Sequence, residues 1–187
     1  MNIEKEKLSN LIHLILKKAG PTSKVKLAKL LLFAEILHFE RTGQSITGLY
    51  FVRLKYGPVI AFFDEILENY KGKLWNEEIK SLPIYEECLV KKQYIYSAVT
   101  NEIRMNGIEP TIKKLISKYR KKSGTELSNL SHSLPAWKYS EPNEPIYLAE
   151  LIIKDDKDFF ALTDLLEDTS DDDSVLAEKF SRSLPRN

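Results

Sequence analysis

The sequence predicts a mostly α-helical domain, a compact unit around one buried central helix with one small β hairpin or short sheet. Three observations support this fold class. Residues 24–41 are apolar almost all round a helix, which is typical of a buried helix. Two further segments, 3–18 and 110–122, repeat apolar residues at helical spacing. Two short segments, 49–55 and 88–99, are rich in aromatic and β-branched residues, which favour strands.

The first helix is expected over residues 3–18, because Leu8, Leu11, Ile12 and Ile15 recur at steps of three and four. Two lysines occupy its last turn, where cations suit the negative end of the helix dipole. A Gly-Pro pair follows and ends the helix, because glycine supports a C-terminal turn and proline cannot continue the helix.

The second helix is expected over residues 24–41, with Thr22 or Ser23 as its N-cap and Gly43 just after its end. One apolar stripe is widened by further residues almost to a full circle, which indicates the buried central helix of the core. The apolar positions of this helix are Val25, Leu27, Leu30, Leu31, Leu32, Phe33, Ala34, Ile36 and Leu37.

A strand is expected over residues 49–55, ended by the turn Tyr56-Gly57-Pro58. Because proline suits the first turn of a helix, a helix is expected to begin at Pro58 and to carry apolar residues from Val59 to Leu67. The stretch bounded by Gly72 and Pro83 is expected to be irregular.

The second half continues with a strand or hairpin arm over 88–99 and a helix over 110–122. Thr125 is expected to cap a short helix that runs to about residue 133. An extended segment is expected over 146–151, and a last helix over 155–167.

The chain is expected to form one domain over residues 1–167, followed by an acidic, flexible tail over 168–187. The net charge is +1 but is unevenly spread: residues 141–187 carry 5 Lys/Arg against 13 Asp/Glu, whereas residues 1–60 carry 10 against 4. Such an acidic end either folds back on the basic body or stays solvated.

Bulk features favour a cytoplasmic protein without a membrane span. No run of 18 apolar residues occurs, the first residues lack the apolar core of a signal peptide, and the single Cys88 cannot form an internal disulfide. With only seven dispersed glycines, no phosphate-binding loop or nucleophile elbow can be drawn.

Candidate catalytic and metal-binding residues are few. Three histidines and Cys88 lack the local spacing that would supply two metal ligands from one element. Glu87 beside Cys88 would raise the pKa of the thiol and so disfavour a nucleophile. We therefore expect no metal, no cofactor and no enzyme activity.

Two blocks of sequence resemble a known family. The first begins with Lys26-Leu-Ala-Lys-Leu-Leu-Leu-Phe-Ala34 and continues through Gly43 and Ile46-Thr-Gly48 to Tyr56-Gly-Pro-Val59. The second is Leu130-Ser-His132 with Pro135-Ala-Trp137. In this order they are similar to the Panacea domain, also called the SocA-type antitoxin domain, over about residues 8–150.

The resemblance implies a mostly helical antitoxin that neutralises a cognate protein toxin by direct binding. It also implies a place in phage defence and, as in the SocA-type member, delivery of the toxin to a ClpXP-type protease. Two positions depart from the family's pattern: Ala28 stands where many members have Gln, and Ser133 where many have Glu. If those side chains touch a toxin, this chain uses other contacts.

Seven residues are candidates for partner binding, and each is also compatible with a structural role. Aromatic and cationic side chains dominate protein interfaces, and the resemblance singles out some of the same positions. The candidates are Lys29, Tyr50, Tyr56, Lys118, Tyr119, His132 and Trp137.

The alternative function is a DNA-binding transcriptional regulator. The basic helix 113–122, which includes Lys118, would then face phosphates, or else its lysines are simply the solvated face of an amphipathic helix. The pI of about 7.7 is not typical of a dedicated nucleic-acid domain.

Overall fold

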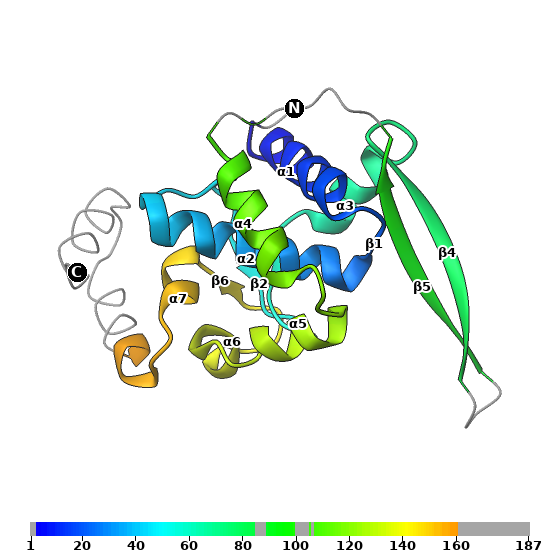
Figure 1. The fold of residues 1–187 in the computed structure, drawn as a ribbon. Helices are drawn as coiled ribbons and strands as arrows, with labels where there is room; N and C mark the ends of the chain where they lie inside the picture. Colours follow the sequence, from blue (N-terminus) through cyan, green and yellow to red (C-terminus); the bar gives the residue numbers. More distant parts are fainter. Residues whose placement is uncertain (1–2, 85–88, 100–104, 106, 161–187) are drawn as a thin grey trace.

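The computed structural model of the 187-residue chain describes all residues except 1–2, 85–88, 100–104, 106 and 161–187. Helices predominate, and two small antiparallel sheets complete the fold (Figure 1). In chain order the elements are α1 (Ile3–Ala19), β1 (Thr22–Ser23), α2 (Lys24–Thr42), β2 (Phe51–Val52), β3 (Val59–Ile60), α3 (Phe63–Asn69), β4 (Trp75–Ile84), β5 (Leu89–Ala98), α4 (Glu109–Tyr119), α5 (Gly124–Ser131), α6 (Pro135–Tyr139), β6 (Pro145–Ile146) and α7 (Leu148–Ile152).

The two long N-terminal helices form where the apolar spacing predicts them. The side chain of Ser23 accepts a hydrogen bond from the backbone N–H of Lys26 and so caps α2. Gly43 ends α2 in the left-handed conformation, with φ of 69°, and its N–H donates to the carbonyl of Phe39. Helix α2 contacts α1, α4, α5 and α7, and its buried side chains join those of α1 in one core.

The first sheet has the strand order β1-β5-β4. Strands β4 and β5 pair along their full length, from Trp75 opposite Ala98 to Ile84 opposite Leu89. The prediction of an irregular stretch between Gly72 and Pro83 is therefore wrong. The strand lacks the alternating pattern that predicts strands, because residues 76–82 are almost all exposed, and Pro83 interrupts it. Proline is tolerated there because β4 lies at the edge of the sheet.

The second sheet has the order β3-β2-β6 and joins three two-residue strands. The prediction of a helix from Pro58 is wrong at its start, because Val59–Ile60 pair with β2 and the helix begins only at Phe63. The extended segment predicted over 146–151 is confirmed only at Ile146, since Leu148–Ile152 are helical.

Helices α4 and α5 lie close to their predicted positions. The N-cap of α5 is Ser123 and not Thr125: the side chain of Ser123 accepts from the N–H of Glu126, whose carboxylate in turn accepts from the N–H of Ser123. Of the predicted helix over 155–167, residues 156–160 are helical. The remainder, together with the predicted tail over 168–187, lies outside the described residues.

Candidate functional site

An apolar cavity of about 530 Å³ lies between the start of α2, the β2–β3 hairpin and the start of α3. Large, partly exposed side chains stand on its walls, among them Leu54 and Tyr56. Its volume and its mostly apolar lining are typical of ligand-binding pockets. The lining residues are Lys24, Val25, Ala28, Lys29, Val52, Leu54, Tyr56, Val59, Ile60, Ala61, Phe62, Phe63, Asp64 and Glu65.

Of the two lysines that line this cavity, only Lys29 is fully buried. Only 1% of the residue is exposed, and its Nζ donates a hydrogen bond to the carbonyl of Pro58 at 2.8 Å. Burial lowers the pKa of Lys29 to about 7, because the ammonium loses its hydration. Near neutral pH this lysine therefore exists in both protonation states.

The turn between β2 and β3 is built around Gly57, whose φ is +95°. A Cβ at this position would lie 2.1 Å from Oγ of Ser131 and 2.7 Å from Nζ of Lys29, so only glycine fits. Ser128 Oγ donates to the carbonyl of Tyr56 at 2.7 Å, which fixes the same turn to α5. The Tyr-Gly-Pro motif is thus the point where the turn contacts both α2 and α5.

His132 and Trp137 lie next to this turn. Their rings stack with centroids 3.9 Å apart at an angle of 13°, and the guanidinium of Arg53 lies 4.7 Å from the indole centroid. Nε1 of Trp137 donates to the carbonyl of Leu54 at 2.8 Å. Burial lowers the pKa of His132, and the positive charge of Lys29 adds to the effect, which favours the neutral ring. These contacts hold the turn between β2 and β3, which carries Leu54 and Tyr56, in place.

Glu35 is a structurally important residue that sequence reasoning missed. Its carboxylate is fully buried and accepts from the N–H groups of Ile46 and Thr47 at 2.8 and 2.9 Å and from the hydroxyls of Ser45 and Thr47 at 3.0 and 2.6 Å. A lone acid within the apolar stretch of α2 was the available signal. The Ile-Thr-Gly motif is therefore tied to α2 through this side chain.

The predicted partner-binding tyrosines occupy different environments. Tyr56 lines the cavity and is 61% exposed, whereas Tyr50 lies outside the lining and faces Tyr147 with ring centroids 6.4 Å apart. Tyr119 is buried and stacks on Phe33 at 4.9 Å, so it packs α4 against α2.

Lys118 lies on α4 with its Nζ 5.1 Å from the ring of Tyr119, and it does not line the cavity. The structure thus brings Lys29, Tyr56, His132 and Trp137 together around one turn and leaves Tyr50, Lys118 and Tyr119 elsewhere.

Within the described part of the chain, no group of three or more His, Cys, Asp or Glu residues is arranged to hold a metal ion. Cys88 lies outside that part. None of the helices described is both long and apolar enough to cross a membrane. What the site offers chemically is apolar surface with an adjacent, protonatable lysine.

The structure is thus a predominantly helical domain with an apolar cavity between α2, the β2–β3 hairpin and α3. The family model described as "Antitoxin SocA-like, Panacea domain" matches residues 27–138, which is more than half of the chain. The chain therefore belongs to the SocA-like Panacea domain family. No curated protein matches, and no solved structure matches.

Proposed function

We propose that this protein is the antitoxin of a toxin–antitoxin pair and neutralises its cognate toxin by direct binding at the cavity. One observation carries the proposal: sequence blocks more than 70 residues apart, both within the matched family region, converge on the turn that forms one wall of the cavity. Lys29 comes from the first block, and Ser131 and His132 come from the second.

The cavity has the properties of an interface anchor site. Leu54 and Tyr56 are 39% and 61% exposed, and neighbouring contacts with Trp137 and Ser128 hold their backbone in position. Binding energy at protein interfaces concentrates where a large side chain enters a well-formed apolar pocket. An apolar or aromatic side chain of the toxin would fill this cavity.

The test is co-expression of this chain with the small open reading frame encoded beside its gene. We expect the small protein to stop growth alone, and growth to return when both are present and purify as a complex. Leu54→Glu places a charge at the cavity, and we expect a loss of binding of at least about tenfold, the equivalent of ~1.4 kcal/mol.

A matched control is Leu82→Glu on β4, since Leu82 is 41% exposed and lies away from the cavity. Rescue that survives Leu54→Glu but fails with Leu82→Glu would move the binding site to the β4–β5 hairpin. A neighbour that is harmless when expressed alone would contradict the antitoxin function itself.

Delivery of the toxin to a ClpXP-type protease is a finer proposal that follows from the family. We expect the toxin's half-life to shorten when this chain and the protease are both present. Equal half-lives with and without the chain would leave neutralisation by binding as the whole mechanism.

A second candidate function is DNA binding, favoured by the exposed basic face of α4 and the residues after it. Lys113, Lys114, Lys118, Arg120 and Lys121 are all exposed. Phosphate contacts would make binding fall steeply with salt. A gel-shift series with duplex DNA tests this, and absence of binding at low salt, or binding unaffected by neutralising Lys118, Arg120 and Lys121, would exclude it.

A further inference from the structure

The β4–β5 hairpin projects from the helical body as an arm (Figure 1). Strand β5 pairs with β1 on one side and with β4 on the other, so β4 is the outer strand of the sheet. No described strand pairs with the outer side of β4. Ile79 and Leu82 on this strand are 50% and 41% exposed. An open edge of this kind is a template for pairing with another strand.

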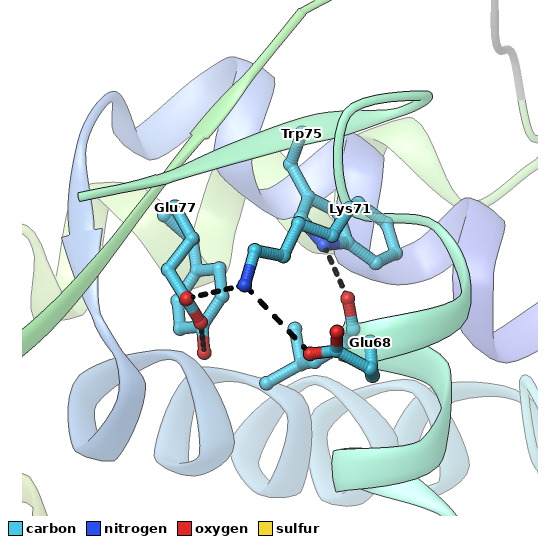
Figure 2. A network of polar contacts seen from close by, with 6 residues as sticks. Glu68, Lys71, Trp75 and Glu77 are labelled. Atoms are coloured by element: carbon cyan, nitrogen blue, oxygen red, sulfur yellow. Dashed lines mark hydrogen bonds and ion pairs between the residues drawn. The ribbon is translucent and has the colours of Figure 1, made fainter. Parts of the chain in front are cut away.

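The root of the arm is firmly anchored. Trp75 is fully buried, and its Nε1 donates to the carbonyl of Leu67 at 3.0 Å. Figure 2 shows Lys71 reaching between two carboxylates, Glu77 at 2.8 Å and Glu68 at 3.8 Å. Because these contacts fix the first residues of β4, the outer edge beyond them has a defined direction relative to the body.

The hydrogen-bond pattern shows which residues of β4 face outward. The N–H of Val99 donates to the carbonyl of Leu74, so this pair and every second residue after it direct their backbone groups toward β5. The carbonyl of Trp75 faces outward and accepts from the N–H of Gly72. By the same alternation, the N–H and C=O groups of Glu77, Ile79 and Ser81 face outward.

The charges on this edge are complementary to a second copy of the same edge. Glu78 and Lys80, the two sequence neighbours of Ile79, share one face of the strand, and 67% and 52% of their side chains are exposed. In an antiparallel pair of two β4 strands with Ile79 opposite Ile79, each Glu78 faces the Lys80 of the other copy. We propose that this protein forms a two-fold symmetric dimer through antiparallel pairing of β4 with β4, in the register centred on Ile79.

Hydrogen bonding and charge select the same register. With the pair centred on Ile79, the outward backbone groups of Ile79 form hydrogen bonds with those of Ile79 in the other copy. On either side of the axis, the outward groups of Glu77 form hydrogen bonds with those of Ser81 in the other copy. Glu78 and Lys80 then form the non-hydrogen-bonded pairs, in which opposing side chains come closest.

Registers centred on Glu77, Glu78 or Lys80 are disfavoured. Centring on Glu78 or Lys80 would place like charges opposite each other, and would also place inward-facing backbone groups at the axis. Centring on Glu77 would bring a partner strand against the segment before Trp75, where Gly72 already occupies the edge. The proposal concerns assembly and does not depend on the antitoxin function.

Sedimentation velocity of the full chain, from about 1 to 100 µM, tests the proposal, because dissociation constants of modest interfaces fall in this range. We expect a reversible dimer. Lys80→Glu should weaken it at least about tenfold, because both symmetric pairs become repulsive. The double variant Glu78→Lys, Lys80→Glu restores opposite charges in the same register and should recover the dimer.

Two further variants separate the edge from general effects of charge and folding. Ile79→Pro removes an outward N–H that bonds nothing in the hairpin, so it should abolish the dimer while circular dichroism stays unchanged. Lys91→Glu alters an exposed residue of β5 and should leave the dimer intact.

Three results would overturn the proposal. One is that the protein stays monomeric up to the highest concentration. This holds also if the monomer forms a complex with a co-expressed toxin, because the proposed partner of β4 is a second copy of the same strand. Another is a dimer that is unaffected by Ile79→Pro. The third is a dimer weakened by Lys80→Glu that the double charge exchange does not restore.

Discussion

Two lysines show how differently the cavity turn and the root of the arm are held together. Lys29 is buried with the neutral carbonyl of Pro58 as its partner, and its pKa falls to about 7. Lys71 lies at the surface between Glu68 and Glu77, and the hydrogen bond to Glu77 raises its pKa. The turn therefore depends on tight packing around a poorly solvated cation, whereas the root of the arm depends on solvated ion pairs and one buried tryptophan.

The largest expected effect contrasts a glycine from each region. Gly57→Ala should lower the free energy of unfolding by about 3 kcal/mol or more, because the new methyl group overlaps Ser131 and Lys29 and the φ value is strained. Gly72 also has a positive φ of +74°, but a Cβ added there would meet nothing within 4 Å, so Gly72→Ala should lower it by only about 1 kcal/mol. Urea unfolding of both variants measures the contrast, and equal losses would show that packing at the turn is unimportant.

The next effect is a pH dependence that only the buried lysine should produce. Below about pH 7, the folded and unfolded states both hold the proton of Lys29. As the pH rises through 7, the folded state releases it while the unfolded state keeps it up to about 10.5. The wild type should therefore gain about 2 kcal/mol relative to Lys29→Met between pH 7 and 9.

Lys71→Met is the matched control for that measurement. Since the pKa of Lys71 is raised, both states keep its proton over the same pH window. The difference between the wild type and this variant should stay flat from pH 7 to 9. A slope in the control, or none for Lys29→Met, would contradict the assignment of a buried, weakly basic lysine.

The smallest effect concerns the acid at the root of the arm. Hydrogen bonds from Lys71 and Tyr96 lower the pKa of Glu77. The stability it contributes is present above its ordinary pKa and is lost as the pH falls through the lowered one. Glu77→Gln should lower the free energy of unfolding by about 1 kcal/mol at pH 7, and the difference should shrink toward pH 3. A difference that does not change with pH would mean that the charge is not involved.

The helices could be predicted from the sequence because their signals are local. Ser23 and Gly43 delimit α2 through side-chain and backbone geometry that neighbouring residues decide. Strand β4 could not be predicted, because its pairing with β5 overrides a segment that is largely exposed and interrupted by Pro83. Misplacing the N-cap of α5 at Thr125 has a different cause: both Ser123 and Thr125 are good caps, and only the position of Glu126 distinguishes them.

The candidate site was predictable only as a set of residues and not as an arrangement. The sequence predicted seven partner-binding residues but not which of them lie together. The structure brings only Lys29, Tyr56, His132 and Trp137 to one turn beside the cavity. That arrangement depends on contacts between α2 and α5, which are about a hundred residues apart. For the same reason Glu35 was missed, since its partners after α2 become visible only once the chain has folded back.

The short strand β1 connects the arm mechanically to the cavity. Thr22 and Ser23 pair with Tyr96 and Ile95 of the arm, and the next residue, Lys24, begins the helix that lines the cavity. The Nζ of Lys24 also contacts Asp64 at the cavity at 3.0 Å. A displacement of the arm would therefore act on the first turn of α2 through these two pairs, as well as on the contacts of Trp75 and Lys71 at its root. The arm and the cavity therefore share the first turn of α2, so a partner bound to one of them is linked to the other by covalent and hydrogen-bonded contacts within the chain.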